Sequence, residues 1–248
     1  HVCHGEPLNR IQCRYRRRPE AARAAAVTET VMTAGVDVKI CGIRTADDYD
    51  ACRAAGAAFV GMVFFPRSPR HLSMQEARTL ADHADRSAGG PARVALTVDM
   101  DDAGLEEVVA AARPRLIQLH GSETPDRAAA IRARFGLPLI RAIRVAGPED
   151  LAACPEWEGI ADWLLFDAKG DPGGLPGGTG HVFDWTLLAD HAGKTRWMLA
   201  GGLSIHNIIR ALAVTGANAV DVSSGVEFAP GKKDADRIRN FVSRAQLG

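Results

Sequence analysis

The sequence predicts an α/β fold, a (β/α)8 TIM barrel, and three observations support this prediction. Eight strand-like runs alternate with helical stretches over about 210 residues, which is close to the usual size of such a barrel. Glycine and polar residues collect after the last strands, where barrels commonly build a site. The rival architecture, an open doubly wound sheet, would carry GxGxxG after its first strand, and that motif is missing there.

The expected strands are short apolar or β-branched runs, most of which end on glycine or polar residues. The first of them, VDVKICG, ends on a cysteine followed by a glycine. The eight expected strands span residues 36–42, 58–65, 92–99, 115–121, 138–145, 162–168, 196–202 and 219–225.

The expected helices carry recognisable start and stop signals. Thr45 can cap the first helix and Gly56 can end it, whereas Ser73 and Glu76 have the spacing of a capping box. Pro125 suits the first turn of a later helix. The eight expected helices span residues 45–56, 73–84, 101–112, 124–135, 148–154, 184–192, 204–216 and 234–246.

The first 35 residues differ from the remainder, residues 36–248, which we expect to form one catalytic barrel domain. The stretch NRIQCRYRRRPEAARAAA is rich in arginine and alanine and has almost no strand pattern. We expect residues 1–35 to be a loose, disordered basic tail. A transit peptide is one alternative. An artefactual extension translated upstream of the true start is another, since the chain lacks an initial Met while Met32 precedes the first strand.

Charge and cysteine content narrow the function classes. Thirty basic and thirty acidic residues give a formal net charge of zero, so no global field recruits nucleic acid or an anionic membrane. No apolar run approaches the roughly 20 residues that span a bilayer. The cysteines are odd in number, scattered and without CxxC spacing, which argues against a disulfide scaffold and against a zinc site. We therefore expect the protein in the reducing cytoplasm. The cysteines are Cys3, Cys13, Cys41, Cys52 and Cys154.

In a barrel of this kind all strands present their C-terminal ends at one face, where the active site is built. Residues far apart in the sequence should therefore line one pocket there. The candidates are Cys41, Arg70, His120, Asp167, Gly201, Gly202, Ser223, Ser224 and Gly225.

Two adjacent loops predict a phosphate site. LAGGLS after the seventh strand and VDVSSGVE after the eighth offer small residues whose backbone N–H groups can approach an anion. A short helix beginning near Ser224 would also direct the positive end of its dipole toward the anion. The alternative is that each glycine merely ends a strand. The glycine-rich run at 173–185 could form a lid or a further wall.

Cys41 and Asp167 are the candidates for proton transfer. A strand-end thiol near cations can be partly ionised, and only the thiolate acts as a base. A carboxyl emerging from an apolar strand can have its pKa raised by desolvation and act as an acid. The alternatives are a buried hydrophobic cysteine, as we expect for Cys52 and Cys154, and a salt bridge from Asp167 to Lys169.

Several motifs together resemble the phosphoribosylanthranilate isomerase family of tryptophan biosynthesis. They are VKICGIR, GMVFFPRSPRHLS, IQLHGSE, LLFDAKG, GGTGHVFDW, LAGGLSIHN and VDVSSGVEFAPGKKD, and they cover residues 37 to about 245 in the family's order. The N-terminal segment departs from the pattern, since members usually begin close to the first strand.

The resemblance implies roles for particular residues. Cys41 would be the general base and Asp167 the general acid, while Arg70 would grip the anthranilate carboxylate. His120 and Asp221 would line or support the site. The sugar phosphate would be held by Gly201, Gly202, Ser223, Ser224 and Gly225.

The implied reaction is an Amadori rearrangement of an aminoaldose to an aminoketose, which requires no redox cofactor or metal. The implied partner is a small phosphorylated substrate, and family members occur as monomers and homodimers. Two rivals stay open. One is the histidine-pathway aminoaldose isomerase, or an enzyme serving both pathways, although those typically have aspartate where this chain has Cys41. The other is a non-catalytic phosphate sensor.

Overall fold

The computed structural model describes residues 35–169, 183–191 and 193–248. Two segments named in the sequence analysis therefore lie outside the described residues. One is the expected extension, except for residue 35, and the other is the possible lid, except for residues 183–185.

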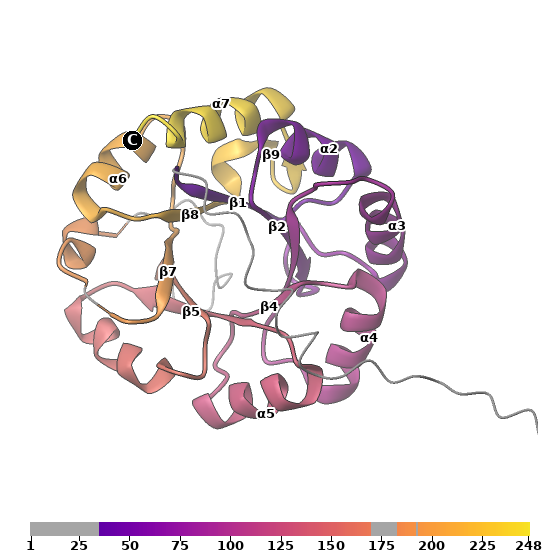
Figure 1. The fold of residues 1–248 in the computed structure, drawn as a ribbon, viewed down its shortest axis with the longest axis horizontal. Coiled ribbons are helices and arrows are strands. Elements are labelled where there is room, and N and C mark those ends of the chain that lie inside the picture. The colour runs from indigo at the N-terminus through magenta and orange to yellow at the C-terminus, as the bar shows by residue number, and fades with distance from the viewer. Residues whose placement is uncertain (1–34, 170–182, 192) are drawn as a thin grey trace, which may run out of the picture. The chain divides into compact units, whose positions relative to one another are not determined.

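The described chain forms the expected barrel. Eight parallel strands pair in chain order and the ring closes between the first and the last. In Figure 1 the strands form an inner ring and the helices an outer one. The strands are β1 (Asp37–Cys41), β2 (Phe59–Phe64), β3 (Ala92–Thr97), β4 (Leu116–Leu119), β5 (Leu139–Val145), β6 (Trp163–Ala168), β7 (Arg196–Leu199) and β8 (Ala219–Val222).

Six α-helices and three 3₁₀ helices follow the strands in the described residues, together with a short hairpin of two strands near the C-terminus. The α-helices are α2 (Ala46–Ala55), α3 (Met74–Asp85), α4 (Asp102–Ala112), α5 (Pro125–Phe135), α6 (Ile208–Thr215) and α7 (Ala235–Ala245). The 3₁₀ helices are η2 (Pro148–Trp157), η3 (Trp185–Leu188) and η4 (Ser224–Val226), and the hairpin is β9 (Glu227–Ala229) with β10 (Lys232–Lys233).

The helix signals read from the sequence are confirmed. Thr45 accepts a hydrogen bond from the Asp48 amide, and Gly56 ends α2 in the left-handed conformation with φ of 81°. Ser73 and Glu76 form a reciprocal capping box at the start of α3. Each cap satisfies backbone groups that the first or last helical turn leaves without a partner.

Two expected α-helices are 3₁₀ helices instead. η2 contains Pro155, which has no backbone N–H and whose ring opposes a continuing α-helix. η3 has four residues, and Asp184 accepts hydrogen bonds from both the amide and the hydroxyl of Thr186. These short-range contacts favour a tight turn over a longer α-helix.

Side chains that point inward fill the barrel, while those that point outward pack against the helices. Alternation along each strand separates the two sets, as expected for a period of two residues. The interior cluster comprises Phe59, Val94, Leu116, Ile140, Ala142, Trp163, Leu165, Met198, Ala200 and Ala219.

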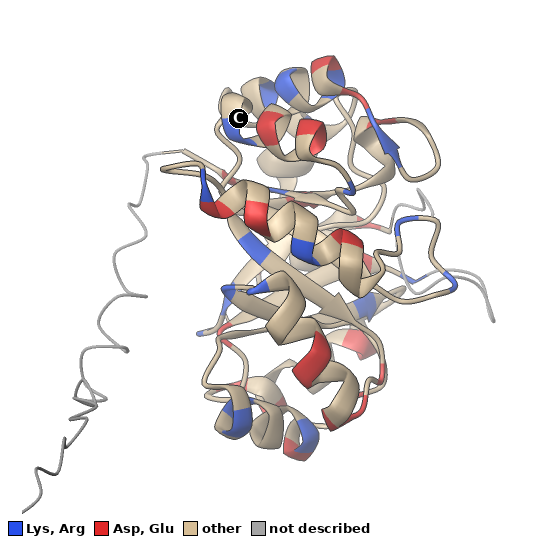
Figure 2. Ribbon diagram, turned by 90° about the vertical axis from the view of Figure 1, so that its right-hand side faces the viewer, with Lys and Arg blue, Asp and Glu red and all other residues tan. Residues whose placement is uncertain are grey.

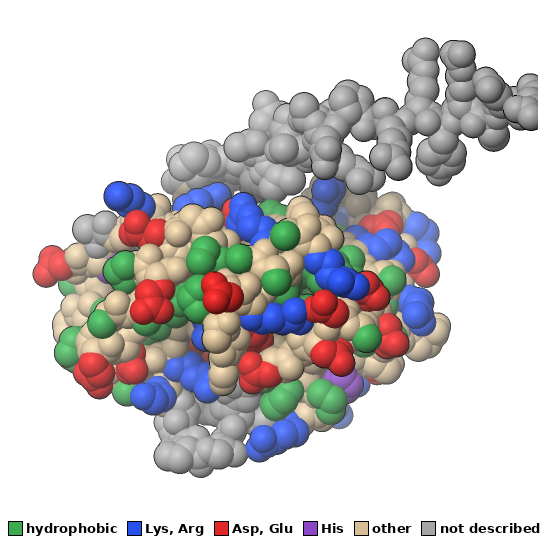
Figure 3. Space-filling model, turned by 90° about the horizontal axis from the view of Figure 1, so that it is seen from below, with side chains coloured by type: hydrophobic (Ala, Val, Ile, Leu, Met, Phe, Trp, Pro, Cys, Tyr) green, Lys and Arg blue, Asp and Glu red, His purple; other side chains and the backbone are tan. Residues whose placement is uncertain are grey.

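Surface charges of both signs are interspersed. Figure 2 shows basic and acidic residues distributed over the helices, and Figure 3 shows both signs mixed over one face. This agrees with the formal net charge of zero. None of the described helices combines the length and the apolar character needed to cross a bilayer.

Candidate active site

The residues predicted from the sequence gather at one end of the barrel, which we call the mouth. Because the strands are parallel and close into a ring, their C-terminal ends all lie there. Cys41 ends β1, Arg70 follows β2, His120 follows β4 and Asp167 lies near the end of β6. The remaining predicted residues lie in β8 or directly after β7 and β8: Gly201, Gly202, Asp221, Ser223, Ser224 and Gly225.

Cys41 is buried at the mouth, with 6% of its surface exposed. Its neighbours in the uppermost apolar layer are Val63 and Leu96. Burial raises the pKa of Cys41 above its usual value, which is opposite to the lowering expected from nearby cations. Lys39 and Lys233 lower that pKa, and the burial of the thiol outweighs them.

An ion pair lies inside the barrel beside this thiol. The Lys39 ammonium, fully buried, lies 2.9 Å from an Asp221 carboxylate oxygen. The two residues face each other in the β1–β8 pairing. Burial disfavours the ammonium, but the carboxylate and the Cys41 thiol together raise the pKa of Lys39. Lys39 is therefore a buried cation.

Arg70 is held by a second buried network. Its Nε and Nη2 donate to the two carboxylate oxygens of Glu227 at 2.8 and 2.9 Å. Lys233 Nζ also donates to Glu227, at 2.8 Å, and to the Ser223 carbonyl at 3.1 Å. Gly42, with φ of 81°, leaves room for the Arg70 side chain, because a Cβ there would lie 2.4 Å from Cδ. The glycine of KICG thus lets the arginine pass over the end of β1.

The two expected phosphate loops lie against each other. A Cβ on Gly225 would stand 2.0 Å from the Leu203 carbonyl oxygen, and a Cβ on Gly201 would stand 2.6 Å from the Ala168 nitrogen. Gly201 and Gly202 have φ of 83° and 62°, which glycine adopts without strain. The short helix expected near Ser224 is the three-residue η4. Only glycine fits these close backbone approaches.

On the other side of the mouth, Asp167 faces His120. The Asp167 Oδ2 atom is 3.5 Å from His120 Nε2, and Oδ1 accepts a hydrogen bond from the Ala168 amide at 2.9 Å. The Gln118 amide nitrogen lies 2.8 Å from His120 Nδ1, and His120 Nε2 is the ring nitrogen on the side of Asp167. Lys169 instead contacts Asp150 at 3.4 Å, so the alternative ion pair with Asp167 is not formed.

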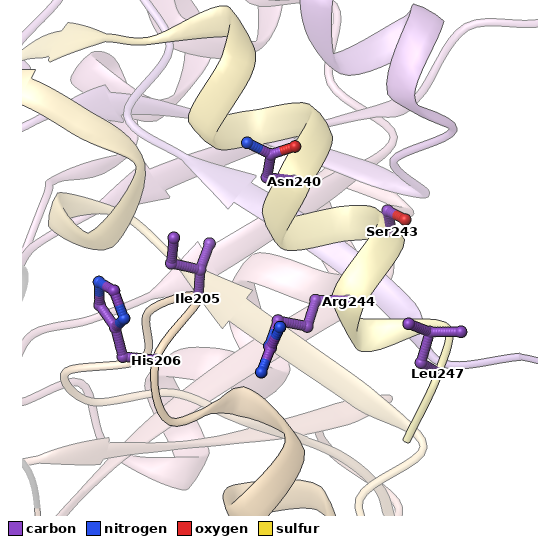
Figure 4. A pocket seen from close by; sticks show the side chains of 6 residues that line it. All are labelled: Ile205, His206, Asn240, Ser243, Arg244 and Leu247. Atoms are coloured by element: carbon purple, nitrogen blue, oxygen red, sulfur yellow. The ribbon is translucent and has the colours of Figure 1, made fainter.

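A groove outside the mouth contains none of the predicted residues. It lies between the loop that precedes α6 and the C-terminal half of α7 (Figure 4), lined by Ile205, His206, Asn240, Ser243, Arg244 and Leu247. Across the described ranges, no three His, Cys, Asp or Glu side chains gather as a metal site would require.

Comparison with known proteins identifies the family. Residues 38–244 match the model of N-(5′-phosphoribosyl)anthranilate (PRA) isomerase, which covers all eight strands of the barrel except the first residue of β1. The chain belongs to the PRA isomerase family.

Individual relatives agree with this assignment. The PRA isomerase of Parvibaculum lavamentivorans is 50% identical over 214 residues, which are 85% of this chain and 98% of that protein. The PRA isomerase of Azorhizobium caulinodans is 52% identical over 208 residues, which are 84% of this chain and 90% of that protein. The resemblance seen in the sequence motifs is therefore confirmed.

Solved PRA isomerase structures share the fold. The enzyme from Thermotoga maritima superposes with a TM-score of 0.76 at 32% identity, covering 86% of this chain and all of that one. A PRA isomerase in complex with reduced 1-(o-carboxyphenylamino)-1-deoxyribulose 5-phosphate gives 0.73 at 31% identity, with the same coverage.

Three charged residues of this PRA isomerase family member were not assigned a role from the sequence. Lys39, Glu227 and Lys233 all lie within the quoted motifs, yet each is a charged residue that would ordinarily be solvent-exposed. One signal could have identified Lys39: it lies two positions before Cys41, so a strand places both on the same side.

Proposed function

We propose that this chain converts N-(5′-phosphoribosyl)anthranilate to 1-(2-carboxyphenylamino)-1-deoxyribulose 5-phosphate by acid and base catalysis. Asp167 donates a proton to the furanose oxygen as the C1′–O bond breaks, which leaves a protonated Schiff base. The Cys41 thiolate then removes the proton from C2′, and the electron pair of that C–H bond neutralises the iminium nitrogen. The resulting enolamine tautomerises to the ketone.

The observation that carries this proposal is the order of the site's parts around the ring. The acid lies on β6 and the base on β1, and the two strands between them, β7 and β8, carry the phosphate loops. A substrate anchored by its phosphate on those loops would extend its sugar between Asp167 and Cys41. Holding both proton-transfer groups against one bound sugar is what general acid and base catalysis requires.

Recognition of the anthranilate carboxylate is assigned to Arg70. Its side chain is 7% exposed, and Glu227 fixes its guanidinium from one edge through two hydrogen bonds. A guanidinium held in this way pays little conformational entropy on meeting a planar carboxylate. His120 and Asp221 have a supporting role. His120 lies against Asp167, and Asp221 pairs with Lys39, which lies beside Cys41. Gly201, Gly202, Ser223, Ser224 and Gly225 hold the phosphate.

The test is a fluorescence assay that follows the loss of phosphoribosylanthranilate with purified protein, in buffer containing EDTA. Turnover that depends on Cys41 and Asp167 supports the proposal, including the absence of a metal requirement. A parallel assay uses the aminoaldose of the histidine pathway. Turnover of that substrate alone would reject the anthranilate assignment, and binding without turnover of either would indicate a phosphate sensor.

The proposal extends to the domain organisation of the chain, its oligomeric state and the compartment in which it acts. Residues 36–248 constitute the catalytic domain, and the enzyme acts in the cytoplasm as a monomer or a homodimer. Sedimentation analysis of the purified chain distinguishes the two assemblies. One solved structure from Thermotoga maritima is of monomers generated from a dimeric PRA isomerase.

A further inference from the structure

Gly61, in the middle of β2, is the point where two reactive side chains converge. A Cβ added there would lie 2.8 Å from the Cys41 sulfur and 3.3 Å from the Lys39 nitrogen. The strand pairing sets Gly61 directly beside Cys41. The absence of a side chain at Gly61 therefore creates the space in which thiol and ammonium meet.

Lys39 is placed to act on the thiol and has no exposed surface. It precedes Cys41 by two residues in β1, so both point into the barrel and Lys39 lies one layer below. Its ammonium donates a hydrogen bond to Asp221 and lies, like the Cys41 sulfur, beside Gly61, and the Cys41 side chain is among the groups that raise the pKa of Lys39. The favourable interaction between opposite charges is stronger inside a protein than in water.

Two other charged groups act on Cys41 among the described residues. Asp221, from β8, disfavours a second negative charge, whereas Lys233, from β10, favours one. Lys233 shares its carboxylate partner, Glu227, with Arg70. Two buried lysines thus surround the thiol, and one of them, Lys233, shares its carboxylate partner with Arg70.

We propose that Lys39 is the positioning residue that stabilises the Cys41 thiolate, and that Gly61 keeps the thiol against it. The inference rests on the proposed role of Cys41 as base. In that step the C2′–H bond breaks and an S–H bond forms, so the sulfur loses its negative charge. Lys39 keeps its own proton throughout and supplies the charge that the thiolate needs before the transfer.

The test measures the pH dependence of Cys41 alkylation by iodoacetamide, with each cysteine peptide quantified by mass spectrometry. In Lys39→Met, the midpoint for Cys41 should move up by about one pH unit or more, and each unit lowers the thiolate fraction about tenfold. The rise of kcat/KM with pH should move with it. KM should change little, because the phosphate loops are untouched.

Two further variants guard against misfolding, since Lys39→Met leaves the Asp221 carboxylate buried without its ammonium. Lys39→Met with Asp221→Asn removes both charges and should still raise the Cys41 midpoint. Gly61→Ala keeps all charges but displaces the thiol, and it should also raise the midpoint.

Two controls accompany these variants. Cys154, whose pKa burial raises to about 11, is the internal control. Lys232→Met, an exposed neighbour of Lys233, is the matched control.

The outcomes separate this inference from the proposed function. Turnover retained by Cys41→Ala would reject the base assignment itself. A second outcome would overturn the role of Lys39 alone: Cys41→Ala loses turnover, but the alkylation midpoint of Cys41 does not move in the Lys39 variants or in Gly61→Ala. A Cys154 midpoint that moves equally would show a general loosening of the fold and would also overturn it.

Discussion

Arg70 and Glu227 meet through two parallel hydrogen bonds, from Nε at 2.8 Å and from Nη2 at 2.9 Å, although 157 residues separate them. The pair joins the loop after β2 to the hairpin after β8, across the end of β1. The guanidinium that we assign to the substrate carboxylate is therefore fixed before substrate arrives.

Arg70→Ala should weaken substrate binding more than it slows the chemical step. The lost contact to the carboxylate should be worth about 1.5 to 3 kcal/mol, as for other hydrogen bonds to charged groups. It should also lower the melting temperature, because Glu227 keeps its Lys233 partner but loses the arginine. Steady-state kinetics and thermal unfolding measure both. The exposed Arg78 on α3 is the control, and parental KM in Arg70→Ala would remove Arg70 from the site.

Cys41→Ala and Asp167→Ala should each fold normally and lose turnover by roughly 10² or more, the usual worth of a positioned acid or base. Both changes lie at the mouth and open no large cavity in the core. The double variant should lose much less than the product of the separate effects, because residues that act as a unit are non-additive. Each variant should still bind the phosphorylated product, as calorimetry can measure. Strictly multiplicative losses would argue against a shared reaction.

Gly225→Ala should raise KM and weaken the binding of the phosphorylated product. Its Cβ would stand 2.0 Å from the backbone oxygen of Leu203, so the two phosphate loops would have to move apart. Gly56→Ala, at the end of α2, is the control: it strains a backbone with φ of 81°, but no atom lies within 4 Å of its new Cβ. A similar change in KM in both variants would show that the effect comes from lost stability.

Removal of residues 1–31 should leave turnover and the melting temperature nearly unchanged. That segment lacks the periodic apolar pattern by which a chain docks on a folded domain. Differential scanning calorimetry and the fluorescence assay compare the full and shortened chains. A fall of several degrees in the melting temperature would mean that the segment stabilises the barrel.

The sequence predicted the barrel well because its signals are local. Thr45, Ser73 and Pro125 mark helix starts within a few residues of the chain, and each helix begins where they indicate. The segment at 148–157 was predicted less well, since Pro155 converts an expected α-helix into a 3₁₀ helix. There the rigid proline outweighs the helical tendency of the alanines before it.

The candidate site was predicted only in part, because some of its contacts are far apart in the sequence. The motifs pointed to Cys41 and Asp167, and the structure places both at the mouth. The partners of the charged groups could not be found in this way. Lys39 pairs with a carboxylate 182 positions away, and Arg70 with one 157 positions away. Only the closure of the ring brings such residues together.

That closure also sets the order in which the molecule can be completed. β1 finds its second neighbour only when β8 is present, and the Lys39 ammonium finds its carboxylate at the same moment. Until the ribosome has released that last strand, the lysine must stay in water, because an unpaired buried cation is costly. Contacts so distant along the chain form slowly. The C-terminal end of the chain should therefore set the pace of folding, and a protein truncated before β8 should remain open and prone to aggregation.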